Sequence, residues 1–300
     1  VSPGNERTYV VLSGLNENMP EAMKLFEKLM ADAQVNKEAY TNMVADILKS
    51  RKDAKLNQMQ NFRRLMNYGM YGPKSPATNI LTEAELQNMD PHELTDRIHN
   101  QNSYKHRIMY YGPTSEKELL AIINKNHQAP KKLKEIPAGM EFPRLETPAT
   151  KVLISPYEAK QIYMTQLSNR GEKFDPMIEP ARQMYNEYFG GGMNSIVFQE
   201  MRESRGLAYS AWAGLNRPSY LKYPYLLQTQ IATQNDKMID AIKVFNDIID
   251  NMPESEAAFQ LAKEALIARL RTERITKSDI IWSYICLLYT SPSPRDTERS

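Results

Sequence analysis

Apolar positions along the chain follow two periods, the alternation of a strand and the three-to-four spacing of a helix. Residues 161–167 (QIYMTQL) and 225–233 are rich in β-branched and aromatic side chains, as strands are. Residues 235–252 instead place apolar side chains such as Ile242 and Phe245 at helical spacing. By the same criteria the sequence predicts strands at 8–12, 106–111, 151–154 and 207–215, and helices at 18–33, from 36 into the fifties, 58–67, 82–88, 91–100, 115–126, 176–189, 194–204 and 254–275.

Capping residues and glycines predict where several of these helices begin and end. Thr82 and Ser115 each precede a glutamate by three residues, which is the pattern of a capping box. Asn194 is placed to cap the helix that follows it, and Gly206 stands where a left-handed C-terminal residue belongs. These four residues set the predicted helix ends.

The order of the predicted elements favours an α+β fold. Strands and helices do not alternate one for one, which excludes a doubly wound sheet, so we expect antiparallel sheets with helices packed on one face. Prolines recur between residues 128 and 148, and this segment is predicted to be an extended linker. The sequence therefore divides into residues 1–127, the linker 128–148 and residues 149–285.

Composition narrows the class of protein further. The 300 residues carry 38 Lys and Arg against 36 Asp and Glu, and a net charge of +2 gives no electrostatic reason to expect nucleic acid as a partner. The richest apolar stretch, residues 280–289, is too short for a membrane span, which needs about 20 such residues. The single cysteine, Cys286, excludes a disulfide framework and a cysteine zinc site within the chain.

Both ends of the chain have unusual sequences. The first residues have no start methionine and lead straight into a strand-like run, so the start looks like a cut. Residues 286–300 (CLLYTSPSPRDTERS) resemble a translated sequencing adaptor, with a genuine Ser/Pro-rich tail as the alternative. We predict that this tail is not part of the fold.

The histidines do not form a recognisable metal site in the sequence. His92, His99 and His106 are spaced by seven residues, but the last lies beyond a predicted helix end, so one helical face cannot hold all three. Neither His-Glu-x-x-His nor His-x-x-Glu-His occurs in the chain. We therefore expect no metal ligands among the residues of this chain.

The most informative stretch is YFGGGMNSIVFQEMRESRGLAYS, residues 188–210. Two arginines, Arg202 and Arg205, lie close together near the end of a predicted helix, and they repel unless they face carboxylates or carbonyls of a partner. Glu203 is expected to point away from Arg202, and Tyr209 follows on the next predicted strand. On these residues alone, the favoured interpretation is a surface ion-pair face that leads into an ordinary strand, rather than a binding site.

This stretch resembles the non-catalytic domains of the pitrilysin–insulinase family of zinc peptidases, the inverzincins. Those domains carry a Gly-Gly-Gly-Met-x-Ser segment followed by Phe-Gln-Glu-x-Arg-Glu-x-Arg-Gly-Leu-Ala-Tyr, which residues 190–209 match almost letter for letter. Residues 8–125 also resemble the family, in the helix GLNENMPEAMKLFEKLM and in Tyr71-Gly72-Pro73 and Tyr111-Gly112-Pro113. The resemblance extends over residues 1–285.

The resemblance implies tandem metallopeptidase-type domains, each with ferredoxin-like halves and both truncated. Residues 1–127 would be the C-terminal part of the third of four domains, and residues 149–285 the N-terminal part of the last. The zinc-binding His-x-x-Glu-His would lie upstream of residue 1, and Asp46 stands near the point where a catalytic domain has a glutamate ligand. Zinc is thus expected in the full-length protein, bound by its N-terminal half, and none in this chain.

The resemblance also implies a function, the substrate-binding half of a zinc endopeptidase that closes around a peptide. Arg202 would hold carbonyls of the peptide substrate, Tyr209 would donate its hydroxyl to the developing oxyanion, and Arg205 would bind substrate or brace the loop. The partners would be the peptide and the N-terminal catalytic half of the same polypeptide, in the bacterial periplasm or the cytoplasm. The alternatives are an inactive family member serving as a scaffold subunit and a small binding module, and the second leaves the motif unexplained.

Overall fold

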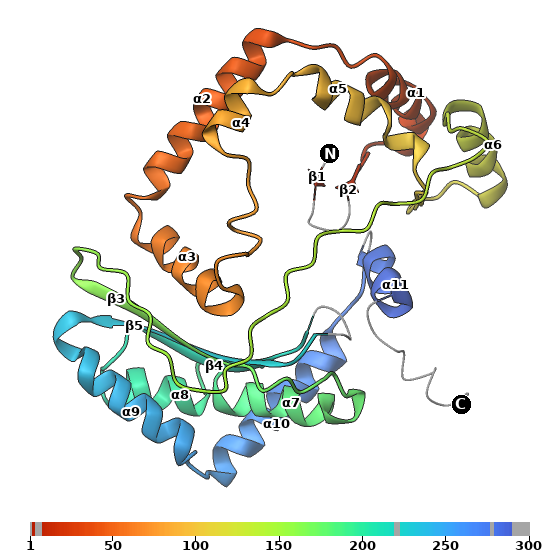
Figure 1. Cartoon of the computed structure of the whole chain (residues 1–300). Coiled ribbons are helices and arrows are strands. Elements are labelled where there is room, and N and C mark those ends of the chain that lie inside the picture. Colours follow the sequence, from red (N-terminus) through yellow and green to blue (C-terminus); the bar gives the residue numbers. More distant parts are fainter. Residues whose placement is uncertain (1, 4–7, 219–222, 277–278, 290–300) are drawn as a thin grey trace. The chain divides into compact units, whose positions relative to one another are not determined.

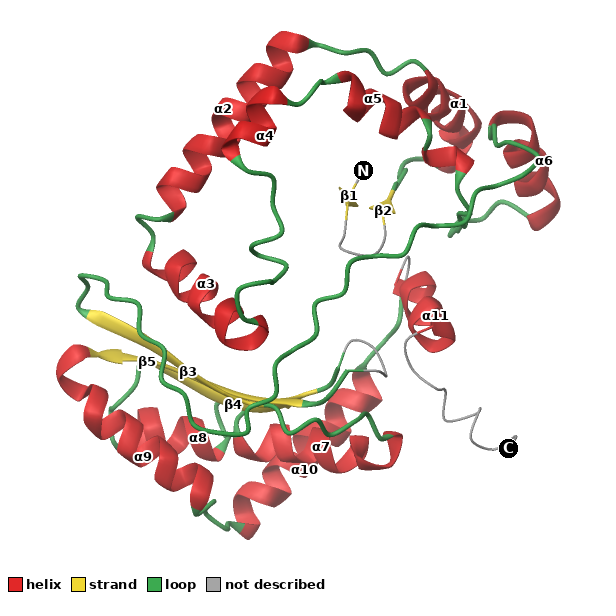
Figure 2. Cartoon of the chain, in the orientation of Figure 1, coloured by secondary structure: helices red, strands yellow, loops and turns green. Residues whose placement is uncertain are grey.

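The computed structural model describes residues 2–3, 8–218, 223–276 and 279–289 (Figure 1). The chain divides into two compact units, Val1–Lys55 with Asn79–Glu141 and Leu56–Thr78 with Phe142–Ser300. Helices and antiparallel strands together make an α+β fold, as the sequence predicts (Figure 2). Among the described residues, no helix is both long and apolar enough to cross a bilayer.

The first unit consists mainly of helices. Their bounds are Met19–Ala31 (α1), Lys37–Ala54 (α2), Glu83–Asn88 (α4), His92–His99 (α5) and Glu116–Asn126 (α6), with short 3-10 turns at Asn16–Asn18 and Gln101–Ser103. The predicted capping boxes are confirmed, because Thr82 and Ser115 each accept from the backbone of a glutamate whose side chain returns to the cap. The Thr82 hydrogen bonds also hold the pKa of Glu85 below its ordinary value.

Three predicted strands are shorter than expected or are not strands in the structure. Only Thr8–Tyr9 (β2) of residues 8–12 forms a ladder, with Ser2–Pro3 (β1), and residues 106–111 and 151–154 have no ladder partner among the described residues. Tyr104 instead makes one isolated bridge to Lys134. The residues have the composition of strands, but a strand also needs a neighbouring strand to satisfy its backbone groups.

The second unit is built on a three-stranded antiparallel sheet in the order β3-β5-β4. Its strands are Gln161–Ser168 (β3), Ser210–Asn216 (β4) and Leu226–Gln234 (β5), and Gln161 pairs with Gln234. One face is covered by Glu179–Phe189 (α7), Ile196–Phe198 (α8), Met238–Asp250 (α9) and Glu256–Thr272 (α10), as Figure 1 shows. The predicted helical layer on one face is therefore confirmed.

The opposite face of this sheet carries Gln58–Tyr71 (α3), which the sequence division places with residues 1–127. The ring of Phe62 lies 5.6 Å from the ring of Tyr163 on β3, and the Leu145 N–H donates to the Met70 carbonyl. These contacts group α3 with the sheet rather than with the helices before and after it. The assignment of the two units to the third and fourth domains of a longer protein stays a prediction.

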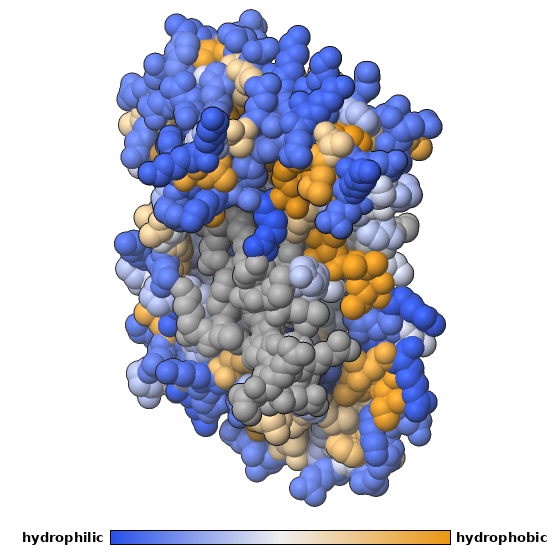
Figure 3. All heavy atoms as spheres, turned by 90° about the vertical axis from the view of Figure 1, so that its right-hand side faces the viewer, coloured by the Kyte–Doolittle hydropathy of each residue, from blue (hydrophilic) through white to orange (hydrophobic). Residues whose placement is uncertain are grey.

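The core of the second unit lies between the sheet and its helical layer. Its buried members are Tyr188, Phe189, Ile196, Val197, Met201, Ala208, Ala211, Ala213, Ile231, Ala241, Phe245, Ile248 and Ala262. Phe189, Met201 and Phe245 are the largest of those that are almost completely buried. Each such side chain contributes about 1.5–3 kcal/mol relative to an exposed position. Apolar side chains also reach the surface in scattered patches among hydrophilic ones (Figure 3).

Helix α7 closes the outer edge of the sheet at β4. The Asn186 side chain donates to the Leu215 carbonyl (3.1 Å) and accepts from the Leu215 N–H (2.8 Å), as a neighbouring strand would. Ala213 lies two residues before Leu215 on β4, and Gly190 at the end of α7 lies so close to it that a Cβ on Gly190 would stand 2.2 Å from the Ala213 carbonyl oxygen. An edge strand with unpaired backbone groups is prone to pair with another chain, and Asn186 satisfies the outward-facing groups of Leu215.

The last described helix, Asp279–Tyr289 (α11), crosses the predicted start of the adaptor-like tail. Residues 286–289 are helical, and residues 290–300 lie outside the described residues. The apolar run continues to Tyr289, and the first helix-breaking residue is Pro292, so the pattern offers no reason for the helix to end at residue 285.

Candidate functional site

The helix that carries the motif begins at Ser195, one residue after the predicted cap. The Ser195 hydroxyl oxygen accepts from the Phe198 N–H (3.4 Å) and donates to the Gly192 carbonyl (2.6 Å). The prediction that Asn194 is the cap is therefore wrong. Ser195 is almost completely buried, whereas Asn194 is exposed, and only the buried hydroxyl faces the helix end.

Residues Gln199–Ser204 form a π-helical turn (η4), which the sequence does not reveal. The chain leaves the turn through Gly206, whose φ of 57° confirms the predicted left-handed position. The N–H groups of Leu207 (2.8 Å) and Ala208 (3.2 Å) then donate to the carbonyl of the buried Met201. Lys237 donates to the Gly206 carbonyl (3.0 Å) and fixes this loop from α9. Single π turns inside helices are frequent at functional sites.

Arg202 extends from the π turn over two aromatic rings. Its guanidinium carbon lies 5.0 Å from the ring centroid of Phe198 and 5.9 Å from that of Tyr209, within the range of cation–π attraction. Its Nε also lies 3.6 Å from a carboxylate oxygen of Glu203, so the expectation that Glu203 points away is wrong. Both side chains are long and half exposed, which lets them bend toward each other across adjacent positions.

Tyr209 lies one residue before β4, not within a strand as the sequence predicts, and its N–H donates to the Ala232 carbonyl (2.8 Å) on β5. Its side chain is 73% exposed, and among the described residues no group hydrogen bonds to its hydroxyl. The structure therefore brings Arg202 and Tyr209 together from a helical turn and from the residue that precedes a strand. One side chain presents charged donors and the other presents a phenolic hydroxyl.

Arg205 has a different environment. Its Nε (3.3 Å) and Nη2 (3.2 Å) both donate to the same carboxylate oxygen of Glu200, within the π turn. This ion pair joins the beginning of the turn to its end. Its geometry suits a residue that braces the loop.

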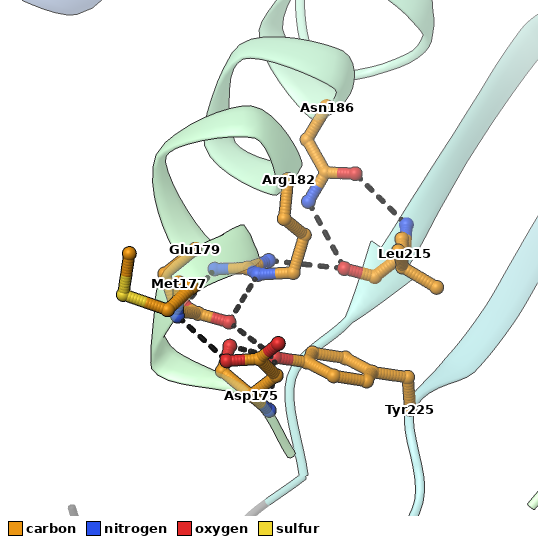
Figure 4. Close-up of polar contacts among 7 residues, drawn as sticks. All are labelled: Asp175, Met177, Glu179, Arg182, Asn186, Leu215 and Tyr225. Carbon is orange, nitrogen blue, oxygen red and sulfur yellow. Dashed lines mark hydrogen bonds and ion pairs between the residues drawn. The ribbon is translucent and has the colours of Figure 1, made fainter. Parts of the chain in front are cut away.

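A second polar cluster fixes the other end of β4 (Figure 4). Glu179 and Arg182 form a two-pronged ion pair (3.0 and 3.1 Å), and Arg182 also donates to the Leu215 carbonyl. The single proton of the Tyr225 hydroxyl is shared between a carboxylate oxygen of Glu179 (2.9 Å) and the Asp175 carbonyl (3.1 Å). Burial, and then the hydrogen bond to Glu179, raise the pKa of Tyr225 above its ordinary value.

This cluster was not predicted from the sequence. Asp175 caps the turn Pro176–Ile178 by accepting from the Met177 N–H. The sequence signal for this cap is Asp-Pro at the start of a predicted helix. No spacing rule indicates that Tyr225 reaches the same place, because it lies 46 residues from Glu179.

Comparison with protein families decides the identity of the chain. The model of the peptidase M16 inactive domain matches residues 107–266, more than half of the chain. The chain belongs to the peptidase M16 inactive-domain family. This confirms the resemblance found in the motif of residues 188–210. A search of curated proteins finds no match to this M16 chain.

Solved structures share the fold of the M16 chain at low sequence identity. The periplasmic protease PqqL from Escherichia coli is 14% identical with a TM-score of 0.69, over 95% of this chain and 31% of that protein. A protease from Helicobacter pylori is 12% identical with a TM-score of 0.61, over 91% of this chain and 67% of that protein. A chain of complex III2 from Candida albicans is 13% identical with a TM-score of 0.56, over 95% of this chain and 71% of that chain. The M16 chain thus spans about a third of the length of the E. coli protease.

Among the described residues, no three His, Cys, Asp or Glu side chains are grouped to hold a metal ion. Asp46 lies on α2 beside an open groove that Met43 and Ile47 also line. His99 contacts the Ala33 carbonyl. The ring of His106 contacts that of His127, the histidine that is not part of the seven-residue spacing.

Proposed function

We propose that this chain is the non-catalytic, substrate-binding half of a zinc endopeptidase that encloses and hydrolyses peptides. The observation that carries the proposal is the exposed pair formed by Arg202 and Tyr209, held on a π turn and a strand end within the motif of an M16 inactive domain. Zinc and the general base would come from an N-terminal half of the same polypeptide, since the residues described here do not provide a zinc site.

The chemistry of the two side chains suits complementary roles. Arg202 carries several N–H donors in a planar fork, which bind carbonyl oxygens of an extended peptide and hold them in register. Tyr209 carries one O–H donor that no described residue occupies, so it is free to donate to an oxyanion as charge develops. A single preorganised donor of this kind contributes about 2.7–4 kcal/mol to transition-state stabilisation.

The decisive experiment compares the chain alone with the full-length protein on a quenched-fluorescence peptide. We expect no cleavage by the chain alone, and cleavage by the full-length protein that falls when Tyr209 is changed to Phe. Cleavage by the chain alone, or full activity of the Tyr209→Phe protein, would contradict the proposal.

A second candidate function is a scaffold subunit without catalysis. The observation that favours it is the shared fold with a chain of complex III2 from Candida albicans, at 13% identity. In that case the full-length protein has no peptidase activity, and substitution of Arg202 or Tyr209 leaves its assembly unchanged. Co-purification of a stable multi-subunit complex together with an inactive full-length protein would decide for the scaffold.

A further inference from the structure

The loop between Arg202 and Tyr209 is tied at Gly206 in both directions. The Gly206 N–H donates to the Arg202 carbonyl (3.1 Å), and the Gly206 carbonyl accepts from the Lys237 ammonium group (3.0 Å). Gly206 has a φ of 57°, and a glycine has more backbone conformations open to it than any other residue. A contact that fixes its carbonyl therefore restricts the part of the loop that would otherwise move most freely.

The next residues of the loop are held by groups of the core. The N–H groups of Leu207 and Ala208 donate to the carbonyl of the buried Met201. The hydroxyl of Thr233, which is almost completely buried, donates to the Leu207 carbonyl. Loss of a buried hydrogen bond of this kind destabilises the fold as a whole. Lys237 is only partly buried, so its contact with the loop can be removed while the core stays intact.

The turn that carries this lysine, Asn235–Lys237, is itself fixed to the sheet. It follows β5 directly, and the Asn235 N–H donates to the Lys160 carbonyl (3.2 Å) just before β3. The Asn235 side-chain amide donates to the Ala159 carbonyl (2.6 Å). The ammonium group can therefore hold its carbonyl partner at a defined place relative to the sheet.

Lys237 is an unfavourable residue for the helix in which it stands. The turn continues directly into α9 at Met238, so Lys237 belongs to the first turn of one helical run. The helix dipole favours acidic side chains at this end and disfavours cations. A residue that breaks a local rule is expected to have a role elsewhere, and the contact with Gly206 supplies one.

We propose that Lys237 is a positioning residue for Arg202 and Tyr209. By holding the Gly206 carbonyl, it maintains the spacing that brings the guanidinium carbon of Arg202 to 5.9 Å from the centre of the Tyr209 ring. This inference rests on the proposed function, in which the two side chains act on one peptide. A misplacement of about 1 Å can lower a reaction rate about 10²-fold, so a contact away from the reacting atoms can control the rate.

The first test uses Lys237→Met, which keeps most of the length of the side chain and loses the ammonium donor. In the full-length protein this change should lower kcat on a quenched-fluorescence peptide by about 10- to 100-fold. Lys237→Arg should keep most of the activity, because a guanidinium also donates to a carbonyl. Lys243→Met is the matched control, because it removes the same charge from an exposed position on α9, and kcat should stay unchanged.

A double variant separates positioning of the catalytic hydroxyl from a general structural role. Tyr209→Phe already lacks the hydroxyl, so adding Lys237→Met to it should lower kcat by less than about threefold further. Residues that act through one another show this kind of non-additivity. An equal fold loss of kcat in both backgrounds means that Lys237 acts independently of the Tyr209 hydroxyl, and this result overturns the inference.

Amide hydrogen exchange of the chain alone tests the contact without catalysis. Lys237→Met should speed exchange at the Gly206, Leu207 and Ala208 amides by at least about fivefold, because the loop opens more often. Unchanged exchange in α10 and an unchanged urea midpoint show that the variant is folded. Unchanged exchange in the loop overturns the inference, whatever the activity. An inactive wild-type full-length protein overturns the proposed function instead, and the exchange comparison then still decides whether Lys237 holds the loop.

Discussion

The guanidinium carbon of Arg202 lies 5.9 Å from the centre of the Tyr209 ring, although one residue belongs to a helical turn and the other directly precedes a strand. The contact is to the face of the ring, so the Tyr209 hydroxyl and the guanidinium donors other than Nε, which faces Glu203, are left for a third group. Attraction between a cation and an aromatic face is worth about 0.5–1 kcal/mol at an exposed site. This is enough to align the two side chains and too little to lock them in place.

Changing Tyr209 to Phe in the full-length protein should remove catalysis without removing binding. If the hydroxyl meets the oxyanion only as charge develops, kcat and kcat/KM fall together and KM stays nearly the same. The loss should be on the order of 10²–10³ in rate, because one such donor is worth a few kcal/mol. Steady-state kinetics on a quenched-fluorescence peptide measure both constants.

The control for this change is Tyr111→Phe, another exposed tyrosine, which should leave both constants unchanged. The ring of Tyr209 stays in place in the Phe variant, so the free energy of unfolding should change by less than about 0.5 kcal/mol. Near-full kcat in the Tyr209→Phe protein would show that the hydroxyl has no catalytic role.

Changing Arg202 to Ala should act mainly on substrate binding. Its proposed contacts are to peptide carbonyls that are present before the reaction begins, so KM should rise at least as much as kcat falls. Arg202→Lys should restore little, since a point charge does not replace a planar fork of donors. Arg271→Ala, an exposed arginine on α10, is the control, and an equal effect at both positions would argue against a specific contact.

Two glycines of the triple glycine should differ in how much an alanine substitution destabilises the fold. Gly190→Ala places a Cβ 2.2 Å from the Ala213 carbonyl oxygen, and separating the two backbones should cost at least about 1–3 kcal/mol in the free energy of unfolding. Gly192→Ala meets no atom within 4 Å and should change that free energy by less than about 0.5 kcal/mol. Urea unfolding of both variants measures the difference, and equal stabilities would contradict the close approach of α7 to β4.

The sequence predicted the helices better than the strands. Helices such as α9 and α10 are specified by their own spacing and caps, so the pattern predicts them to within a few residues. Residues 106–111 and 151–154 have equally strand-like compositions, but a ladder requires a partner strand that the pattern does not name. The same limit explains why α3 groups with the sheet in the structure but not in the sequence division.

The part of the candidate site that lies within one short motif could be predicted from the sequence. Arg202 and Tyr209 lie seven residues apart, so recognising the motif was enough to expect them together. The π turn and the contact between Arg202 and Glu203 depend on backbone geometry and rotamers, which residue types do not determine. The meeting of His106 with His127 joins segments 21 residues apart, and helical periodicity does not reach across the loop between them.

The polar cluster at Tyr225 predicts a loss of stability at high pH. Burial and the hydrogen bond to Glu179 raise the folded-state pKa of Tyr225. In the unfolded chain the phenol titrates near its ordinary value of about 10. Between these two values the folded state keeps a proton that the unfolded state has lost, so the contribution of Tyr225 is fully present below about pH 10 and is lost as the pH rises through the folded-state pKa.

The measurement is the difference in free energy of unfolding between the wild-type chain and Tyr225→Phe, by urea unfolding from pH 7 to pH 11. At pH 7 the variant should be less stable by about 1–3 kcal/mol, because the Asp175 carbonyl and a Glu179 oxygen lose a buried donor. Above about pH 10 the difference should shrink, since the unfolded wild type has then lost the phenol proton and must take it up again to fold. All other titratable groups are the same in both proteins and cancel in the difference. A difference that stays constant up to pH 11 would mean that the hydroxyl of Tyr225 is not held as a buried donor to Glu179.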